Sequence, residues 1–176
     1  MPDCLENQPD SIALALLPLR LQTATEADLP VTGLSMGSLT RNASHVRVQR
    51  LAGEPAFGDV ILFRTQQQLV AHRVISIRRR DEQILTKGDA CPTADPPVAK
   101  DTILGKVIGT LVHGQLTIPM RLRAPWCRIL AINSRLQHQY RSRWPRLGRS
   151  LDPFRFLNRL LERSTQWKHI PSDPTY

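Results

Sequence analysis

Cysteines and long apolar runs are scarce in this sequence. Its three cysteines, Cys4, Cys91 and Cys127, are an odd number, and their spacing matches neither a disulfide framework nor a metal site. The longest apolar run, IALALLPL at 12–19, is far below the roughly 20 residues that a membrane-spanning helix needs, and it follows an acidic start rather than the positive start of a signal peptide. We therefore expect a cytoplasmic protein, at most attached to a membrane surface, with no metal and no cofactor.

Acidic residues are scarce in the last third of the chain. Residues 1–120 contain twelve Lys or Arg and twelve Asp or Glu, whereas residues 121–176 contain twelve basic residues and three acidic ones. The net charge of +9 therefore comes entirely from the C-terminal region. Such a basic surface suits an anionic partner, although a solvated basic face is the simpler explanation. Because the sequence has no helix-turn-helix or zinc motif, we do not expect nucleic acid to be that partner.

The chain is long enough for one domain with a tail. At 176 residues and 41% hydrophobic composition, it can form one full core but hardly two. Residues 10–22 predict an amphipathic helix that breaks near Pro18 and runs into a strand, so residues 1–28 form an N-terminal segment. Residues 29–120 predict a compact, mostly β domain, because short β-type runs alternate with turn residues. The predicted strands are HVRVQRL (45–51), DVILF (59–63), LVAHRVISI (69–77), QILTK (83–87) and ILGKVIGTLV (103–112).

The spacing of the apolar residues lengthens to that of a helix after Pro119. A second helix is predicted to begin with Asp152 as its N-cap and Pro153 at the first helical position. Residues 121–176 thus form a basic helical extension. One interpretation is that this extension covers an open face of the sheet. The other is that residues 121–168 bind an anionic partner or a membrane surface. The residues at helical spacing are Trp126, Ile129, Leu130, Asn133, Leu136 and Tyr140 in the first helix and Phe154, Leu157, Leu160 and Leu161 in the second.

Ser35 lies in VTGLSM (31–36), at the end of a segment that is predicted to be extended. Gly-x-Ser is common in turns, so this serine could be a turn residue. It could also be a nucleophile, which needs a base to take its proton and donors to hold the oxyanion. The choice depends on whether the chain places a base on a rigid element.

His72 is the candidate base, because it lies in the middle of LVAHRVISI. Strand alternation puts it on the same face as Val70 and Val74, so the imidazole is at least half buried and its surroundings control its tautomer. Taken alone, such a residue is more often a hydrogen-bonded structural histidine.

The loop LTKGDACPTAD (85–95) supplies two carboxylates, Asp89 and Asp95. A loop carboxylate beside a strand histidine can hold the imidazole in the tautomer that accepts a serine proton, and it can stabilise the imidazolium that forms. Each aspartate by itself could simply be a turn residue. The sequence alone does not decide which of the two contacts His72.

The motifs GLSM, GDVILF, LVAHRVISI, ILTKGDA and ILGKVIG follow one another in an order that resembles the signal peptidase family, in its Ser-His-Asp branch. The resemblance covers residues 31 to about 109, which is less than half of the chain. It implies a coiled, mostly antiparallel β fold of the LexA and signal-peptidase type, in which the peptide substrate binds extended, as an added strand.

The resemblance also implies roles for individual residues. Ser35 would be the nucleophile and His72 the base, at a position where the bacterial branch and the LexA-type repressors have a lysine. Asp95 matches the aspartate of the triad, and Asp89 in KGD matches an acidic position that supports the site.

Three further residues around Ser35 are predicted to serve the substrate. The backbone N–H of Ser35 would face the oxyanion, with help from the hydroxyl of Thr32 or Ser38, and Met36 would line the floor of the cleft. Ser38 stands where the family motif has a proline, and the loop CPTAD replaces an asparagine-rich loop. A proline would stiffen the turn, so the sequence predicts a looser turn here.

The sequence predicts two alternative functions, one as an enzyme and one as a binding module. The first is a soluble, cytoplasmic serine endopeptidase that cleaves a specific protein or leader peptide through Ser35, His72 and Asp95. Because the sequence predicts no membrane anchor, ordinary processing of exported precursors is not expected. The second is an inactive peptide-binding module of the same fold, which the loss of the proline at Ser38 would favour. In either case the basic tail could attach the protein to a partner or an anionic surface.

Overall fold

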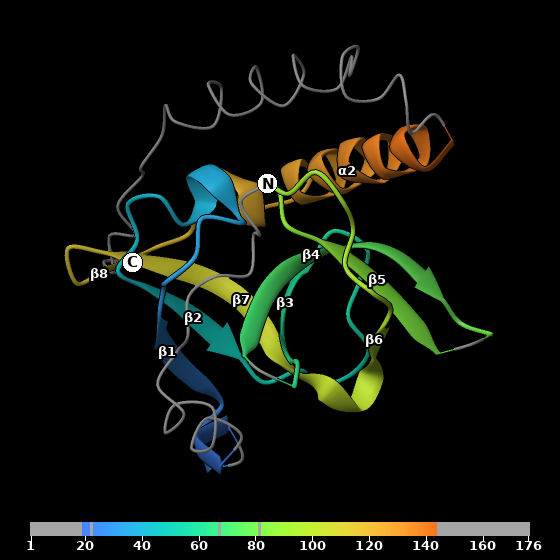
Figure 1. Cartoon of the computed structure of the whole chain (residues 1–176). Coiled ribbons are helices and arrows are strands. Elements are labelled where there is room, and N and C mark those ends of the chain that lie inside the picture. The colour runs from blue at the N-terminus through green and yellow to red at the C-terminus, as the bar shows by residue number, and fades with distance from the viewer. Residues whose placement is uncertain (1–18, 22, 67, 81, 144–176) are drawn as a thin grey trace.

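The computed structural model describes residues 19–21, 23–66, 68–80 and 82–143. An antiparallel β-sheet that curls into a half-barrel forms its body (Figure 1). The strands pair in the order β1-β2-β7-β3-β4-β5-β6, and β8 pairs with β7. The prediction of a mostly β domain is therefore confirmed. The strands are β1 (Glu26–Pro30), β2 (His45–Gln49), β3 (Val60–Arg64), β4 (Leu69–Arg78), β5 (Gln83–Lys87), β6 (Val98–Ala99), β7 (Ile103–Val112) and β8 (Gln115–Thr117).

Each of the five predicted strands is present, with ends that differ by at most two residues. Strand β2 shows the alternation of buried and exposed side chains that its sequence predicts. Val46 and Val48 are buried, while the residues between and beside them are more exposed. In β3 the four residues from Val60 to Phe63 are all buried, as expected for a central strand whose two faces are both covered. Strand β4 is central too, since it pairs with β3 and β5.

The apolar side chains form two clusters on the curled sheet. One contains Met36 and Leu39 together with side chains from β2, β3 and β7, and it packs beneath the turn that carries Ser35. The other lies between β3, β4 and β5 and includes Ile61 and Val74. The described residues also include three short 3-10 helices: η1 (Gly37–Leu39) between β1 and β2, η2 (Lys100–Thr102) between β6 and β7, and η3 (Met120–Leu122) before α2.

Helix α2 (Trp126–Arg143) confirms the helix that the sequence predicts after Pro119. It lies along one side of the sheet and packs against β4 and η3 (Figure 1). This agrees with the interpretation that the helix covers the sheet. The second predicted helix, from Asp152, and residues 1–18 lie outside the described residues. Residues 19–21 and 23 are helical, so the predicted change from helix to strand near Pro18 is wrong, and the strand begins only at Glu26.

The buried face of α2 differs from the predicted stripe. Leu130 and Asn133 are buried as expected, but Ile129 and Leu136 are 40% and 45% exposed. The helix instead buries Ala131 and three polar residues, because the nearby surface carries the buried charged side chains of β4 and β5. The spacing of apolar residues therefore indicated the helix but not its packed face. The three polar residues are Asn133, Ser134 and Gln137.

Candidate active site

Ser35 lies at the corner of a tight turn that follows β1. The N–H of Gly37 donates to the carbonyl of Leu34 at 2.9 Å, and Met36 has the φ of −91° and ψ of 4° typical of the third position of a type I turn. Gly37 continues with a φ of +59°, a left-handed conformation that glycine adopts without strain. The turn therefore leaves the partly exposed side chain of Ser35 on its outer corner.

His72 is held rigidly in the centre of β4. It pairs with Ile61 of β3, its side chain is only 2% exposed, and its ring meets the edge of Phe63 with the ring centroids 6.4 Å apart. Its Nδ1 atom lies 2.7 Å from Oδ2 of Asp95. The structure thus brings Asp95, and not Asp89, to this histidine.

The carboxylate of Asp95 is fixed by a second donor. The hydroxyl of Thr86 on β5 donates to the same Oδ2 atom at 2.6 Å. The backbone N–H of Asp95 also donates to the carbonyl of Thr86 at 2.9 Å, so the residue is tied to β5 through both its main chain and its side chain. Because Asp95 accepts from Nδ1, the Nε2 atom of His72 is the one left to act as a base.

The loop after β5 brings the Ser35 turn to the free side of His72. The N–H of Ala90 donates to the carbonyl of Ser35 at 2.8 Å. A Cβ atom on Gly88 would lie 2.7 Å from that carbonyl oxygen and 3.0 Å from Nε2 of His72, so only glycine allows these two groups to approach so closely. Among the described residues the Ser35 hydroxyl and Nε2 make no hydrogen bond to each other. The Ser35 main chain and the candidate base nevertheless border the same small space.

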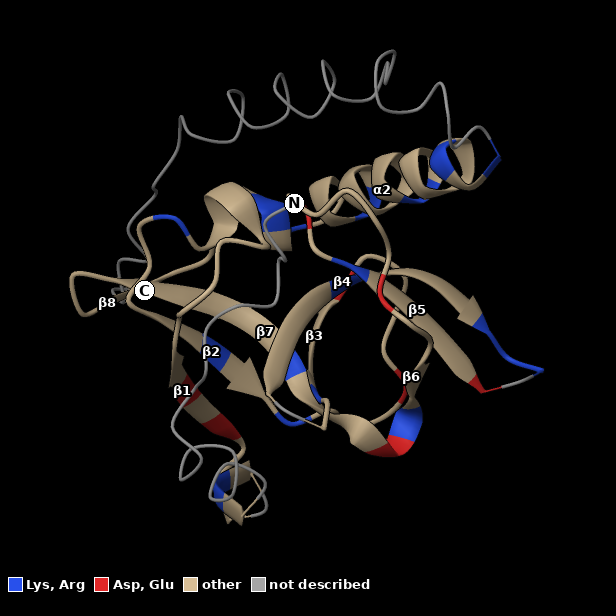
Figure 2. Cartoon of the chain, viewed as in Figure 1, with Lys and Arg blue, Asp and Glu red and all other residues tan. Residues whose placement is uncertain are grey.

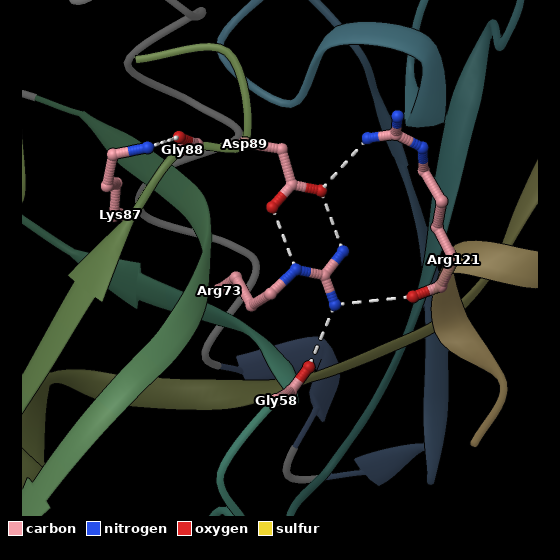
Figure 3. Close-up of polar contacts among 6 residues, drawn as sticks. All are labelled: Gly58, Arg73, Lys87, Gly88, Asp89 and Arg121. Carbon is pink, nitrogen blue, oxygen red and sulfur yellow. Dashed lines mark hydrogen bonds and ion pairs between the residues drawn. The ribbon is translucent and has the colours of Figure 1, made fainter. Parts of the chain in front are cut away.

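Asp89 has a different partner, the buried Arg73 (Figure 3). Nε and Nη2 of Arg73 donate to the two carboxylate oxygens of Asp89 at 2.8 and 2.7 Å. The remaining Nη1 donates to the carbonyls of Gly58 at 2.9 Å and Arg121 at 3.3 Å. Arg121 also points its guanidinium at Asp89, with Nη1 at 3.4 Å from Oδ2. This network joins β4, the loop after β5 and η3 in front of α2.

Two opposing effects determine the pKa of the Asp89 carboxyl. Burial alone would raise it, but the charge and the hydrogen bonds of Arg73 lower it. The charges of Arg121 and Lys87 also lower it, so the pKa of Asp89 lies below its ordinary value. The Asp89 carboxylate is therefore ionised at neutral pH, and through Arg73 it holds the loop on β4.

The three other residues predicted around Ser35 occupy different environments. Met36 is 2% exposed and packs in the hydrophobic cluster with Leu39 and Val46, so it anchors the turn from below. Thr32 is exposed. The hydroxyl oxygen of Ser38 is buried and has no hydrogen-bond partner among the residues that the structure describes. A substrate oxyanion would reach the Ser38 hydroxyl only if the turn changed its conformation.

Sequence reasoning missed Arg73, Thr86 and Gly88. The signal for Arg73 was a charged residue in the middle of an otherwise apolar strand run, since a buried arginine requires an anionic partner. Gly88 was interpreted only as a turn residue at the end of a strand. Thr86 gave no signal, because a threonine in a strand is ordinary.

The described parts of the chain contain no cluster of three or more His, Cys, Asp or Glu side chains that could hold a metal ion. None of their helices combines the length and the apolar character needed to cross a membrane.

No protein-family model, curated protein or solved structure matches this chain.

The Arg73–Asp89 pair yields a prediction about stability. Asp89→Asn should lower the free energy of unfolding at neutral pH by about 3–5 kcal/mol, because it leaves the Arg73 guanidinium buried without a counter-charge. The lowered pKa of Asp89 means that its contribution is present above the ordinary value of 3.8 and is lost as the pH falls through the folded-state pKa. Urea unfolding of wild type and variant, from neutral pH into the acid range, measures both effects.

Asp28→Asn is the matched control for this prediction. Asp28 makes the same two-pronged contact with Arg47, at 2.7 and 2.8 Å, but the two side chains are 34% and 28% exposed. A surface pair of this kind contributes about 0–1 kcal/mol. Equal losses in the two variants would contradict the claim that burial makes the Asp89 pair important.

Proposed function

We propose that this protein is a serine endopeptidase of the LexA and signal-peptidase type, with Ser35 as nucleophile, His72 as base and Asp95 as the group that orients the base. The observation that carries the proposal is the 2.7 Å contact between Nδ1 of His72 and Oδ2 of Asp95, on the side of the imidazole away from the Ser35 turn. A buried histidine with one nitrogen held by a carboxylate and the other close to a serine turn is the arrangement that nucleophile activation requires.

The proposed reaction moves one proton through His72. Nε2 takes the proton from the Ser35 hydroxyl as the oxygen attacks the scissile carbonyl, and Asp95 stabilises the imidazolium that forms. Nε2 then gives the proton to the leaving amine, and the C–N bond breaks to leave an acyl-enzyme on Ser35. Water, deprotonated by the same nitrogen, releases the acyl group and restores Ser35.

The oxyanion would be held by backbone groups of the turn. Among the described residues, the N–H of Ser35 donates no hydrogen bond, so this donor is available to the developing negative charge. Without substrate the catalytic hydrogen bond between Ser35 and His72 is not formed, and such contacts commonly tighten only when substrate binds.

The substrate is proposed to bind in an extended form along β1. This strand pairs with β2 on one side, and no other described strand pairs with its second edge. Since β1 leads directly into the turn that carries Ser35, a peptide added to this edge would run past the nucleophile. A specific protein or leader peptide with an exposed extended segment fits such a site.

The alternative is a peptide-binding module that has kept the cleft but not catalysis. The observation that favours it is Ser38, whose buried hydroxyl has no hydrogen-bond partner and which stands where the resemblance places a stiffening proline. In that case, removal of the Ser35 hydroxyl would leave peptide binding and the biological role unchanged.

Labelling with a fluorophosphonate, read by intact mass, tests the peptidase proposal. We expect one adduct on the wild type, and none on Ser35→Ala or His72→Ala, because an activated serine needs its base. Ser44→Ala is the control, since Ser44 also contacts a histidine: its Oγ lies 3.1 Å from Nδ1 of the neighbouring His45 at the surface. This variant should be labelled like the wild type.

Two results would contradict the peptidase proposal. An adduct that persists in Ser35→Ala and disappears in Ser44→Ala would place the reactive serine elsewhere. No adduct on folded wild type with either a fluorophosphonate or a peptidyl boronate would favour the binding module.

A second proposed activity is attachment of helix α2 to an anionic membrane surface. The outer side of α2 exposes Ile129, Ile132 and Leu136 at spacings of three and four residues. The helix contains Arg128, Arg135, Arg141 and Arg143 and no acidic residue. In Figure 2 it accordingly carries blue segments and no red ones. Arg128 and Arg135 lie beside the apolar stripe and are exposed. An apolar stripe flanked by arginines suits the boundary between lipid headgroups and acyl chains.

Vesicle co-sedimentation tests this attachment. The wild type should bind vesicles of phosphatidylcholine and phosphatidylserine better than vesicles of phosphatidylcholine alone. Ile132→Asp should abolish binding, and Arg135→Ala should weaken it about fivefold, since one arginine near such a surface contributes about 1 kcal/mol. Arg50→Ala, an exposed arginine directly after β2, is the control and should bind like wild type. Unchanged binding of Ile132→Asp, or no preference for the anionic vesicles, would overturn the proposal.

A further inference from the structure

Thr86 is a fully buried residue of β5 that contacts Asp95 twice. Its hydroxyl donates to Oδ2 of Asp95 at 2.6 Å, and its carbonyl accepts the N–H of Asp95 at 2.9 Å. Its exposed fraction is 0%, so water cannot take the place of this hydroxyl. Thr86 on β5 therefore holds Asp95 in the loop through both its main chain and its side chain.

The Oδ2 atom of Asp95 is shared by two donors. Nδ1 of His72 lies 2.7 Å from it and the Thr86 hydroxyl 2.6 Å from it, and these are the only donors to this carboxylate among the described residues. A carboxylate oxygen can accept more than one hydrogen bond, so the two contacts do not exclude each other. Thr86 thus fixes the position of the one oxygen atom that contacts His72.

Without Thr86 the Asp95 side chain would have greater freedom. Asp95 lies in the loop between β5 and β6, and its side chain is 17% exposed, so other rotamers of the carboxylate could point to water. A rotated carboxylate would leave Nδ1 without its acceptor. The imidazole could then carry its proton on Nε2, which would no longer accept a proton from Ser35.

We propose that Thr86 is a positioning residue for this site: it holds the Asp95 carboxylate so that His72 keeps its proton on Nδ1 and leaves Nε2 as the base. This inference rests on the proposed function for its catalytic meaning, but the tautomer of His72 can be measured without any substrate. Thr86 acts only through Asp95 and touches no reacting atom.

Thr86→Val and Thr86→Ser separate this role from simple packing. Valine keeps the shape of threonine and loses the hydroxyl, whereas serine keeps the hydroxyl and loses a methyl group. The tautomer of His72 is read from 15N spectra of histidine-labelled protein, with the resonance assigned by its loss in His72→Ala. The rate of fluorophosphonate labelling, corrected for the folded fraction, is the second measurement.

We expect the Nδ1–H tautomer to dominate in wild type and Thr86→Ser, and to give way to a mixture in Thr86→Val. The labelling rate should fall on the order of tenfold in Thr86→Val, as for other small displacements of catalytic groups, and stay close to wild type in Thr86→Ser. If the valine variant does not fold, Thr86→Ala replaces it, because alanine puts no methyl group against the carboxylate.

A purely structural Thr86 would give a different pattern. Its variants would lower the free energy of unfolding but leave the tautomer and the labelling rate of the folded protein unchanged, and this result would overturn the inference. Failure of the proposed function would be visible separately. The wild type would then resist labelling, while the tautomer of His72 would still change in Thr86→Val.

Discussion

The buried ion pair between Arg73 and Asp89 is the interaction on which the rest of the site depends. Arg73 is completely buried in a central strand, and removing its counter-charge would cost several kcal/mol. The loop after β5 must therefore stay docked on β4. Since His72 is the residue before Arg73 in the strand, its side chain points to the opposite face, where the same loop delivers Asp95. One loop thus supplies two carboxylates, Asp89 for anchoring and Asp95 for orienting the imidazole.

Contacts from the loop after β5 and from the core hold the turn that carries Ser35. Gly88 lets the loop approach both the Ser35 carbonyl and Nε2 of His72, and the N–H of Ala90 fixes that approach with a hydrogen bond of 2.8 Å. The turn gains a second anchor from Met36, which is buried in the core beneath it. The stiffness that a proline would give to the turn is therefore replaced in part by contacts from the loop and the core.

The strands and α2 could be predicted because alternation and helical spacing are local properties of the sequence. The packed face of α2 could not, because it depends on the buried charges of β4 and β5, which make polar residues such as Asn133 suitable for burial. In the candidate site, the order of motifs pointed to Ser35, His72 and both aspartates. The partners of Asp89 and Asp95 could not be assigned, because both lie on one loop and only its docking decides which of them faces His72.

The most direct test of this account compares the fluorophosphonate labelling rates of Asp95→Asn and Asp89→Asn, each corrected for the fraction of folded protein. The account predicts that Asp95→Asn loses on the order of 10³- to 10⁴-fold in rate, because His72 then lacks the acceptor that selects its tautomer. In the Asp89→Asn molecules that still fold the loop is docked, so they should lose far less rate than Asp95→Asn, since Asp89 contacts Arg73 and not His72. The reverse order, with Asp89→Asn inactive and Asp95→Asn largely unchanged, would contradict the assignment of Asp95 to the proposed triad.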